Sequence, residues 1–287
     1  MSDVSFRQTA VATALCRRAT RTTAPRQSGA AAARFALVVL FLLFVQGAAG
    51  VEVLEEMIEQ KYVLDPEATL TISDTDGSIR IYAADVGEIS IQAIKKAYTS
   101  DRLKSIVVDV SATRKSIAIE TIFPPKKSAL SLSDRSGTVE YIVTVPHTIR
   151  ITKLDLVNGE VLVEGLRGGS ATAHLINGWL AAHNCFGDLN FTIVNGRLDV
   201  SYDWWENTKF CVKLSSSHGN IRALIPSDAS AGITARTGTG RIANAFEMQK
   251  EIPSEPVHAL DFATEPMPET AFEINSTNGN IRIDKTY

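Results

Sequence analysis

Glycine recurs at a nearly constant interval between Leu154 and Val200, and this spacing limits the folds open to the chain more than any other feature. Nine or ten residues separate the members of the series Gly159, Gly169, Gly178, Gly187 and Gly196. Three of them follow an asparagine, in the pairs Asn158-Gly159, Asn177-Gly178 and Asn195-Gly196. Gly adopts positive φ freely and Asn tolerates it, so we expect a tight strand reversal at each pair.

Apolar residues alternate with polar ones on both sides of these Asn-Gly pairs. Counted from the Gly, positions −5 and −3 hold Leu154 and Leu156, Ala173 and Leu175, and Phe191 and Ile193. Positions +2 and +4 hold Val161 and Val163, Leu180 and Ala182, and Leu198 and Val200, with weaker copies at Ile221 and Ala223 and at Ile281 and Ile283. Period-two alternation predicts strands with one apolar side, and these residues are the predicted inward set.

The repeat predicts an all-β fold, specifically a single-stranded β-solenoid or β-helix-like stack of short strands with Asn-Gly turns. An antiparallel meander would show the same spacing, because Asn-Gly also closes hairpins. A single meander would leave its apolar face in water, and we find no amphipathic helical segment after Ala68 to cover it. Stacked coils bury these faces against one another, so we favour a solenoid over a sandwich or a barrel.

Residues 1–50 have the features of an export segment. The apolar run 35–49 is shorter than the roughly 20 residues that span a bilayer, Arg34 precedes it, and small residues follow it. We therefore expect a signal peptide with a long N-terminal extension and a mature chain that starts near Gly50 or Val51. An organelle transit peptide and an uncleaved anchor at 35–49 are the alternatives.

Residues 51–287 are expected to form one domain, with irregular N-terminal strands over 51–145 and regular Asn-Gly repeats over 146–287. Period-two runs predict strands at 88–97, 105–110, 116–122 and 138–145, whereas 51–63 is read as an edge strand with a short helix around 54–60 as the alternative. Insertions at 201–208 and 243–270 should be loops outside the coils.

The chain ends on one more copy of the repeat, Asn278-Gly279. A strand so close to the terminus needs protection against pairing with other chains through its edge. Lys285 and the insertion 243–270 are the candidates for that protection.

The net charge of the chain excludes one class of partner. Residues 1–50 contain six Arg and one Asp, so the net charge of −3 for the whole chain becomes −8 for residues 51–287. An acidic surface repels phosphate backbones, which argues against a nucleic-acid partner.

Cys185 and Cys211 remain after export, and they either form one disulfide or stay as two separate thiols.

Trp204 and Trp205 are the most suggestive site residues. Adjacent tryptophans in a polar loop give a flat platform for a sugar ring or a protein partner, unless one of them folds back to plug the stack of coils. His174 and His183 fall on the outward set, where we expect solvated histidines. Asp199 and Asp203 together suggest carboxylate catalysis, although surface acids on an acidic protein are the simpler interpretation.

The sequence shows no spacing of metal ligands, no nucleophile elbow and no phosphate-binding glycine loop. We therefore expect no catalytic residue, no cofactor and no metal site.

A string of NGxV and GxL half-repeats follows a Val-Pro pair in this chain: Val145-Pro146, Asn158-Gly159-Glu160-Val161, Gly165-Leu166 and Gly187-Asp188-Leu189. In this respect the chain resembles the putative adhesin family, a bacterial domain family of unknown function, from about Ala68 to the C-terminus. The resemblance implies a right-handed β-solenoid-like fold, export or surface attachment, and no catalytic residues to carry over.

The export signal, the repeat and the missing catalytic constellation together favour a non-catalytic binding or scaffold module at the cell envelope, in the periplasm or on the cell surface. Its partner would be an unidentified envelope protein or glycan, contacted through Trp204 and Trp205, and membrane contact would come only from an uncleaved signal. The alternative is a β-helix enzyme that acts on envelope or extracellular polysaccharide.

Overall fold

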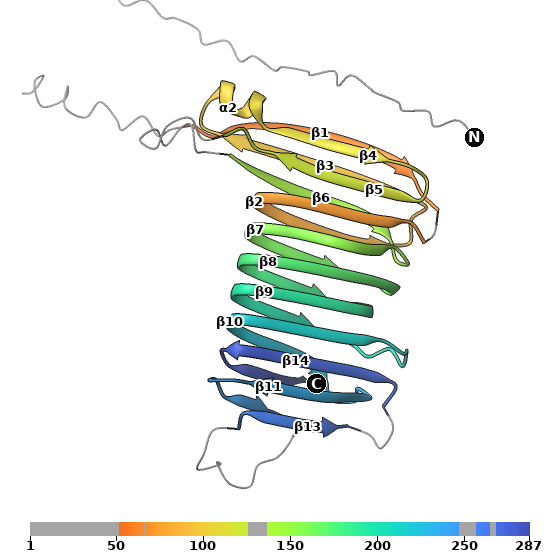
Figure 1. The fold of residues 1–287 in the computed structure, drawn as a ribbon. Helices are drawn as coiled ribbons and strands as arrows, with labels where there is room; N and C mark the ends of the chain where they lie inside the picture. Colours follow the sequence, from red (N-terminus) through yellow and green to blue (C-terminus); the bar gives the residue numbers. More distant parts are fainter. Residues whose placement is uncertain (1–51, 66, 126–136, 247–256, 265–267) are drawn as a thin grey trace, which may run out of the picture. The chain divides into compact units, whose positions relative to one another are not determined.

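The computed structural model describes residues 52–65, 67–125, 137–246, 257–264 and 268–287 (Figure 1). The expected signal peptide and its N-terminal extension, residues 1–50, lie outside these ranges, as do residues 247–256 and 265–267 of the insertion 243–270. The described strands belong to one mixed sheet, which confirms the all-β prediction. They are β1 (Leu54–Val63), β2 (Thr69–Ala84), β3 (Glu88–Ala97), β4 (Val107–Ala112), β5 (Ser116–Ile122), β6 (Thr138–Pro146), β7 (Arg150–Glu164), β8 (Arg167–His183), β9 (Phe186–Ser201), β10 (Cys211–Pro226), β11 (Ala231–Thr237), β12 (Ile242–Asn244), β13 (Ala259–Ala263), β14 (Thr270–Asn278) and β15 (Ile281–Thr286).

The middle of the sheet is a stack of parallel strands in the order β2, β7, β8, β9 and β10 (Figure 1). The register aligns the repeat glycines, since Gly77 pairs with Gly159, Gly159 with Gly178, Gly178 with Gly196, and Gly196 with Gly219. Every residue of the predicted inward set is buried. Counting from the glycines therefore gave both the register and the core correctly.

Each of these strands bends at its glycine. The bend is seen in which residues on either side of the glycine are buried. In β7, Leu156 and Val161 are both buried although five residues separate them, so a straight pleated strand would place them on opposite faces. The strand folds over at Gly159, and the part before it (the first arm) and the part after it (the second arm) bury the same interior. The sequence predicted short strands joined by turns, but the ladder runs on through the bend and each repeat is one strand of 15 to 17 residues.

Glycine is required at the bend mainly because neighbouring backbones approach closely there. A Cβ at Gly178 would overlap the carbonyl oxygen of Gly159, and the φ of Gly178 is +136°. The same overlap would occur at every member of a column that runs in space through Gly77, Gly159, Gly178, Gly196, Gly219, Gly279 and Gly240.

The asparagines before these glycines have a different role from the one predicted. Asn184 is the described non-glycine residue with positive φ, so Asn158, Asn177 and Asn195 do not use that conformation. Their side chains form a ladder instead: Asn195 donates to Asn177 at 3.0 Å, Asn177 to Asn158 at 2.9 Å, and Asn158 to Asp76 at 2.7 Å. Asparagine suits the position because its amide both donates and accepts along the stack.

The N-terminal end of the sheet contains antiparallel pairs. β1 pairs antiparallel with β3, β3 with β6, and β4 with β5, whereas β5 and β6 pair in parallel with the first and second arms of β2. β1 is a strand, which removes the helical alternative for 54–60. A short helix, α2 (Ser100–Ser105), does occur after Ala68; Thr99 caps it and Leu103 is buried, but its six residues are too few to cover the sheet. Because α2 takes up Ser105, the strand predicted at 105–110 begins at Val107.

The C-terminal end departs from the order of the sequence. β14 lies between β10 and β11, and β15 lies between β10 and β12 (Figure 1). The last repeat copy is therefore inserted into the sheet, so neither Lys285 nor the insertion 243–270 is needed to protect a terminal edge. Lys285 instead places its ammonium group 4.8 Å from the ring centre of Phe246.

The insertion 243–270 is also not a loop throughout. β13 pairs antiparallel with β11 and forms the outer edge of the sheet at this end. The run Ala259–Ala263 alternates partly buried and exposed residues, so it can add one more strand to β11. No helix within the described ranges is long and apolar enough to cross a membrane.

One carboxyl group breaks the apolar pattern of the interior. Asp74 pairs with Leu156 in the register, so it occupies an inward position, and it is 6% exposed. Its Oδ1 accepts the Thr75 amide at 2.8 Å, whereas Oδ2 has no partner in the described structure. Burial raises the pKa of Asp74 to about 7, and the neighbouring Asp76 adds to this effect while the hydrogen bond from the Thr75 amide opposes it.

We expect Gly178→Ala to lower the free energy of unfolding by about 2–4 kcal/mol, because the methyl group meets the Gly159 carbonyl and the positive φ is strained. Gly87→Ala is the control, since no atom lies within 4 Å of its Cβ position and its φ is not positive. Urea unfolding of both variants measures the effect. Equal stability of the two variants would contradict the close-approach argument.

Asp74 should make the protein less stable as the pH rises. Its folded pKa of about 7 lies above the ordinary value of 3.8, so the folded state holds the proton more tightly than the unfolded state, and this stabilisation is lost between pH 4 and 8. Asp74→Asn should remove on the order of 2–4 kcal/mol of that loss. Urea unfolding at pH 5 and pH 8 tests this, and an unchanged pH dependence in the variant would refute it.

Candidate functional site

The second arms of β7, β8, β9 and β10 form an open groove of about 380 Å³ on their outer face. Because inward and outward residues alternate, positions +3 and +5 after each glycine, and Trp179 at +1, point away from the core. The groove, named here the Trp179 groove, is lined by Leu162, Glu164, Trp179, Ala181, Ala182, His183, Arg197, Asp199, Val200, Ser201, Arg222 and Leu224. Its lining is mainly apolar, with charged groups at the rim.

Asp199 holds the aromatic wall of the groove in place. The indole Nε1 of Trp179 donates to Asp199 Oδ2 at 2.6 Å, and Arg197 Nε donates to Asp199 Oδ1 at 2.8 Å. The Trp179 residue remains 37% exposed, whereas the Asp199 side chain is only 13% exposed. The carboxylate thus fixes the ring through its Nε1 and leaves part of Trp179 exposed to a ligand.

His183 lies at one end of the groove, between two acids. Its Nε2 is 2.9 Å from Asp203 Oδ2, and its Nδ1 is 3.5 Å from Glu164 Oε1. Asn184, whose φ of 50° turns the chain after β8, donates to Asp203 at 3.1 Å and accepts from the Asp203 amide at 2.8 Å. The bond from Asn184, helped by His183, lowers the pKa of Asp203. His183 is therefore more constrained than the solvated histidine that the sequence suggested.

Asp199 and Asp203, considered as a catalytic pair from the sequence, have different partners. Asp199 is bonded to Trp179 and Arg197, and Asp203 to His183 and Asn184. Within the described ranges, no cluster of three or more His, Cys, Asp or Glu residues is arranged to hold a metal.

The two adjacent tryptophans take opposite roles. The ring of Trp205 lies 5.5 Å from that of Tyr202 and 5.7 Å from that of Phe210, and it packs against the core. Trp204 is 44% exposed, its Nε1 donates to Glu206 at 3.0 Å, and Arg167 lies over its ring at 6.0 Å. Only Trp204 therefore offers a ring face on the outer surface, while Trp205 closes the interior beside it.

Trp205 also lines a smaller polar pocket of about 230 Å³, together with Asn207, Thr208, Asp228, Ser230, Glu269 and Thr270.

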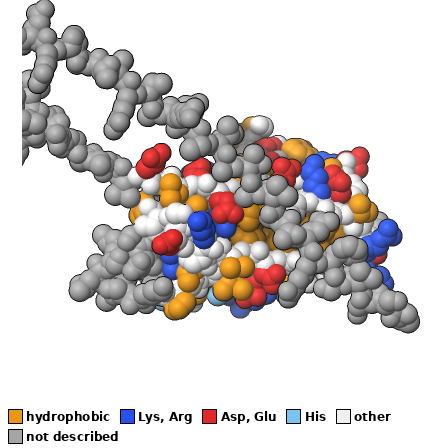
Figure 2. All heavy atoms as spheres, turned by 90° about the horizontal axis from the view of Figure 1, so that it is seen from above, with side chains coloured by type: hydrophobic (Ala, Val, Ile, Leu, Met, Phe, Trp, Pro, Cys, Tyr) orange, Lys and Arg blue, Asp and Glu red, His pale blue; other side chains and the backbone are white. Residues whose placement is uncertain are grey.

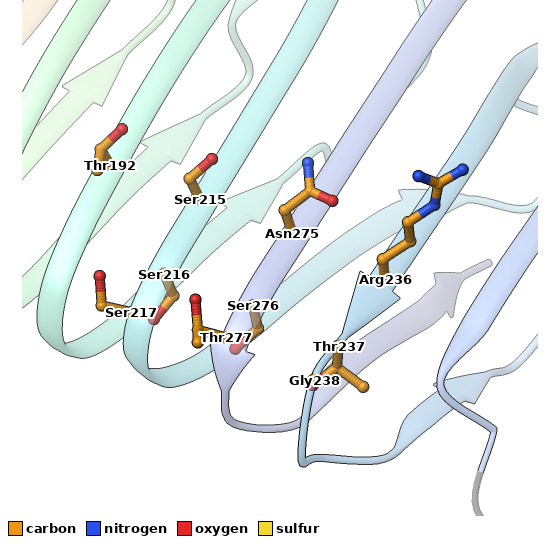
Figure 3. Close-up of a pocket in the computed structure, with 10 residues that line it drawn as sticks. All are labelled: Thr192, Ser215, Ser216, Ser217, Arg236, Thr237, Gly238, Asn275, Ser276 and Thr277. Atoms are coloured by element: carbon orange, nitrogen blue, oxygen red, sulfur yellow. The ribbon is translucent and has the colours of Figure 1, made fainter.

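A second, hydroxyl-rich pocket of about 390 Å³ lies on the outer face of the first arms. Figure 3 shows Thr192, Ser215 and Asn275 in a row from β9, β10 and β14, with Arg236 of β11 beside them. These residues occupy paired positions on adjacent strands. The pocket has no aromatic side chain in its lining, so it lacks the ring face that the Trp179 groove provides.

The end of the sheet that carries β1 and α2 has hydrophobic and charged side chains on the same surface (Figure 2). Figure 2 looks onto this end and shows hydrophobic side chains interspersed with acidic and basic ones. Exposed apolar residues of the neighbouring strands include Met57, Val63, Val107 and Ile122.

Cys185 and Cys211 are both free thiols, which decides the alternative that the sequence left open. Cys185 is buried, and burial raises the pKa of its thiol to about 12. A thiol of that pKa is a poor nucleophile at neutral pH.

The Trp179 groove, with residues from four adjacent strands, could not be read from the repeat alone. Successive members of the set Leu162, Trp179, Arg197 and Arg222 are 17 to 25 residues apart, and only the observed register places them on neighbouring strands. The usable signal was Trp179 itself, a large aromatic residue at an outward position.

Solved structures similar to this chain include a putative cell adhesion protein from Clostridium sporogenes, with 14% identity and a TM-score of 0.47 over 80% of this chain and 100% of that one. A putative adhesin from Bacteroides fragilis matches with 11% identity and a TM-score of 0.30 over 79% and 97%. A putative lipid binding protein from Parabacteroides distasonis matches with 9% identity and a TM-score of 0.31 over 81% and 97%.

No protein-family model and no curated protein sequence matches the chain. The family that the sequence resembles, the putative adhesins, is thus also the one named among the similar structures.

Proposed function

We propose that residues 51–287 act as an exported, non-catalytic binding module of the adhesin type, which holds an envelope or extracellular ligand on its outer face. The observation that carries this proposal is the Trp179 groove: a part-exposed indole ring fixed by Asp199 on a rigid sheet, above an apolar floor. Aromatic faces with nearby polar groups suit sugar rings and protein side chains.

The arrangement of the repeat strands as a β-solenoid is part of the same proposal. We take β2, β7, β8, β9 and β10 as coils of a β-solenoid, each with a first arm, a bend and a second arm. Their in-register glycines and shared interior support this. Stacked coils give extended outer faces suited to long ligands.

Export is supported by the apolar run 35–49 and the small residues after it. Sequencing the N-terminus of the mature protein tests this part. A cytoplasmic protein that still begins at Met1 would overturn it.

The enzyme alternative rests on the carboxylates and His183 near the groove. Asp199 and Asp203 are engaged by separate partners, so the geometry favours binding. Incubation of the protein with envelope and extracellular polysaccharides decides between them: turnover that is abolished by Asp199→Asn or Asp203→Asn would establish the enzyme instead.

The binding proposal is tested on a glycan and protein array with two matched tryptophan variants. Trp179→Ala should weaken binding of any ligand found by at least tenfold, because it removes the ring face of the groove. Trp204→Ala removes an equally large exposed ring outside the groove and should change binding by less than threefold. The reverse result would place the site on the 201–208 loop, as the sequence suggested.

A further inference from the structure

Three arginines lie on the outer face of adjacent strands beside the Trp179 groove. Arg222 of β10 pairs in register with Asp199 of β9 and with Arg282 of β15. Arg197 precedes Asp199 by two residues on β9, so its side chain points to the same face. The side chains of Arg197, Arg222 and Arg282, named here the arginine strip, are 58%, 43% and 66% exposed.

Two carboxylates hold the arginine strip from beneath. Asp284 accepts from Arg222 Nε and from Arg282 Nε, each at 2.7 Å, and its side chain is 12% exposed. Asp199 accepts in the same way from Arg197 Nε. Burial alone would raise the pKa of Asp284, but the hydrogen bonds from Arg282 and Arg222 hold it below its ordinary value, so the carboxylate stays ionised.

This arrangement presents positive charge outward on an acidic protein. A guanidinium has five N–H donors, and these described bonds use the Nε–H of each arginine, so donors on the terminal nitrogens remain for a ligand. The terminal nitrogens form the planar fork that fits a carboxylate in two parallel hydrogen bonds. Asp199 and Asp284 already hold these arginine side chains in place. A ligand that binds them therefore costs less side-chain entropy than one that must order free arginines.

The arginine strip and the groove are continuous, since Arg197 and Arg222 also line the groove beside Trp179 and Leu224. A matching ligand therefore has an apolar ring face and a carboxylate on the same unit, repeated along a chain that crosses the strands. Uronic-acid sugars have this combination.

We propose that the Trp179 groove and the arginine strip bind a carboxylated polysaccharide, with a sugar ring stacked on Trp179 and its carboxylates paired with Arg197, Arg222 and Arg282. This inference rests on the proposed binding function and names the class of its ligand.

Polygalacturonate is the probe, and its fully methyl-esterified form is the matched ligand that keeps the backbone and removes the charge. Calorimetry on the purified full chain should detect binding of polygalacturonate, at least tenfold weaker binding of the ester, and an affinity that falls between 50 and 300 mM salt. Equal binding of both polymers would overturn the inference and leave the binding function intact. Absence of binding to any glycan together with hydrolysis of one would overturn both.

Arg222→Gln should weaken polygalacturonate binding at least tenfold while leaving Arg282 on Asp284. Arg197→Gln, at the other end of the groove, is the second variant in case the first does not fold, and it should weaken binding at least threefold. The control is Arg236→Gln, because Arg236 is an exposed arginine of the hydroxyl-rich pocket on the first arms.

Arg222→Lys keeps the charge but loses the planar fork, so it should bind more weakly than the unchanged protein and still respond to salt. Full affinity in Arg222→Gln and Arg197→Gln would refute the assignment. Tighter binding to anionic lipid vesicles or to single-stranded DNA than to polygalacturonate would also refute it.

Discussion

The close approach of neighbouring backbones at the glycine column is the constraint on which the rest of the structure depends. A side chain at Gly159 or Gly178 would occupy the space of the next carbonyl oxygen in the stack, so only glycine lets the ladder continue through the bend. Because the ladder continues, both arms of each strand stay in register with the arms of the neighbouring strand. The two arms therefore bury their apolar side chains in one shared interior. The asparagine ladder beside the column adds hydrogen bonds between the same neighbours. Repeat length, core and outer faces all follow from this contact.

The bend also gives the protein two outer faces with different chemistry. The first arms present hydroxyl and amide groups around Ser215 and Asn275, whereas the second arms present the indole of Trp179 and the arginine strip. On both faces the backbone is fixed by its neighbours, so a ligand meets side chains that are already positioned. Two carboxylates with little exposure also position surface side chains. Asp199 accepts hydrogen bonds from Trp179 and Arg197, and Asp284 accepts them from Arg222 and Arg282. This is the physical basis for expecting binding on the second arms.

The sequence predicted the inward residues and the register because each copy carries the same glycine and the same alternation. It could not predict that the strands bend without interruption, because Asn-Gly is equally suited to a turn, nor that asparagine was needed for a side-chain ladder. It could not place β14 and β15 either, since the apolar pattern of Ile281 and Ile283 fits beside any other strand of the repeat. The bond between Arg222 and Asp284 joins residues 62 positions apart, and it follows from that placement. The sequence allowed one of the two tryptophans to plug the interior, but only the packing of the Trp205 ring against Tyr202 shows which one does so.

The position of β14 and β15 between β10 and the pair β11 and β12 has a consequence for biosynthesis. A ribosome delivers β10, β11 and β12 before the strands that must separate them. Until β14 and β15 emerge, β10, β11 and β12 lack the parallel neighbours that they have in the structure, so this end of the stack stays open while the earlier strands pair in order. Strands made after β11 and β12 thus complete this end of the sheet from within, so it closes only once β14 and β15 have emerged.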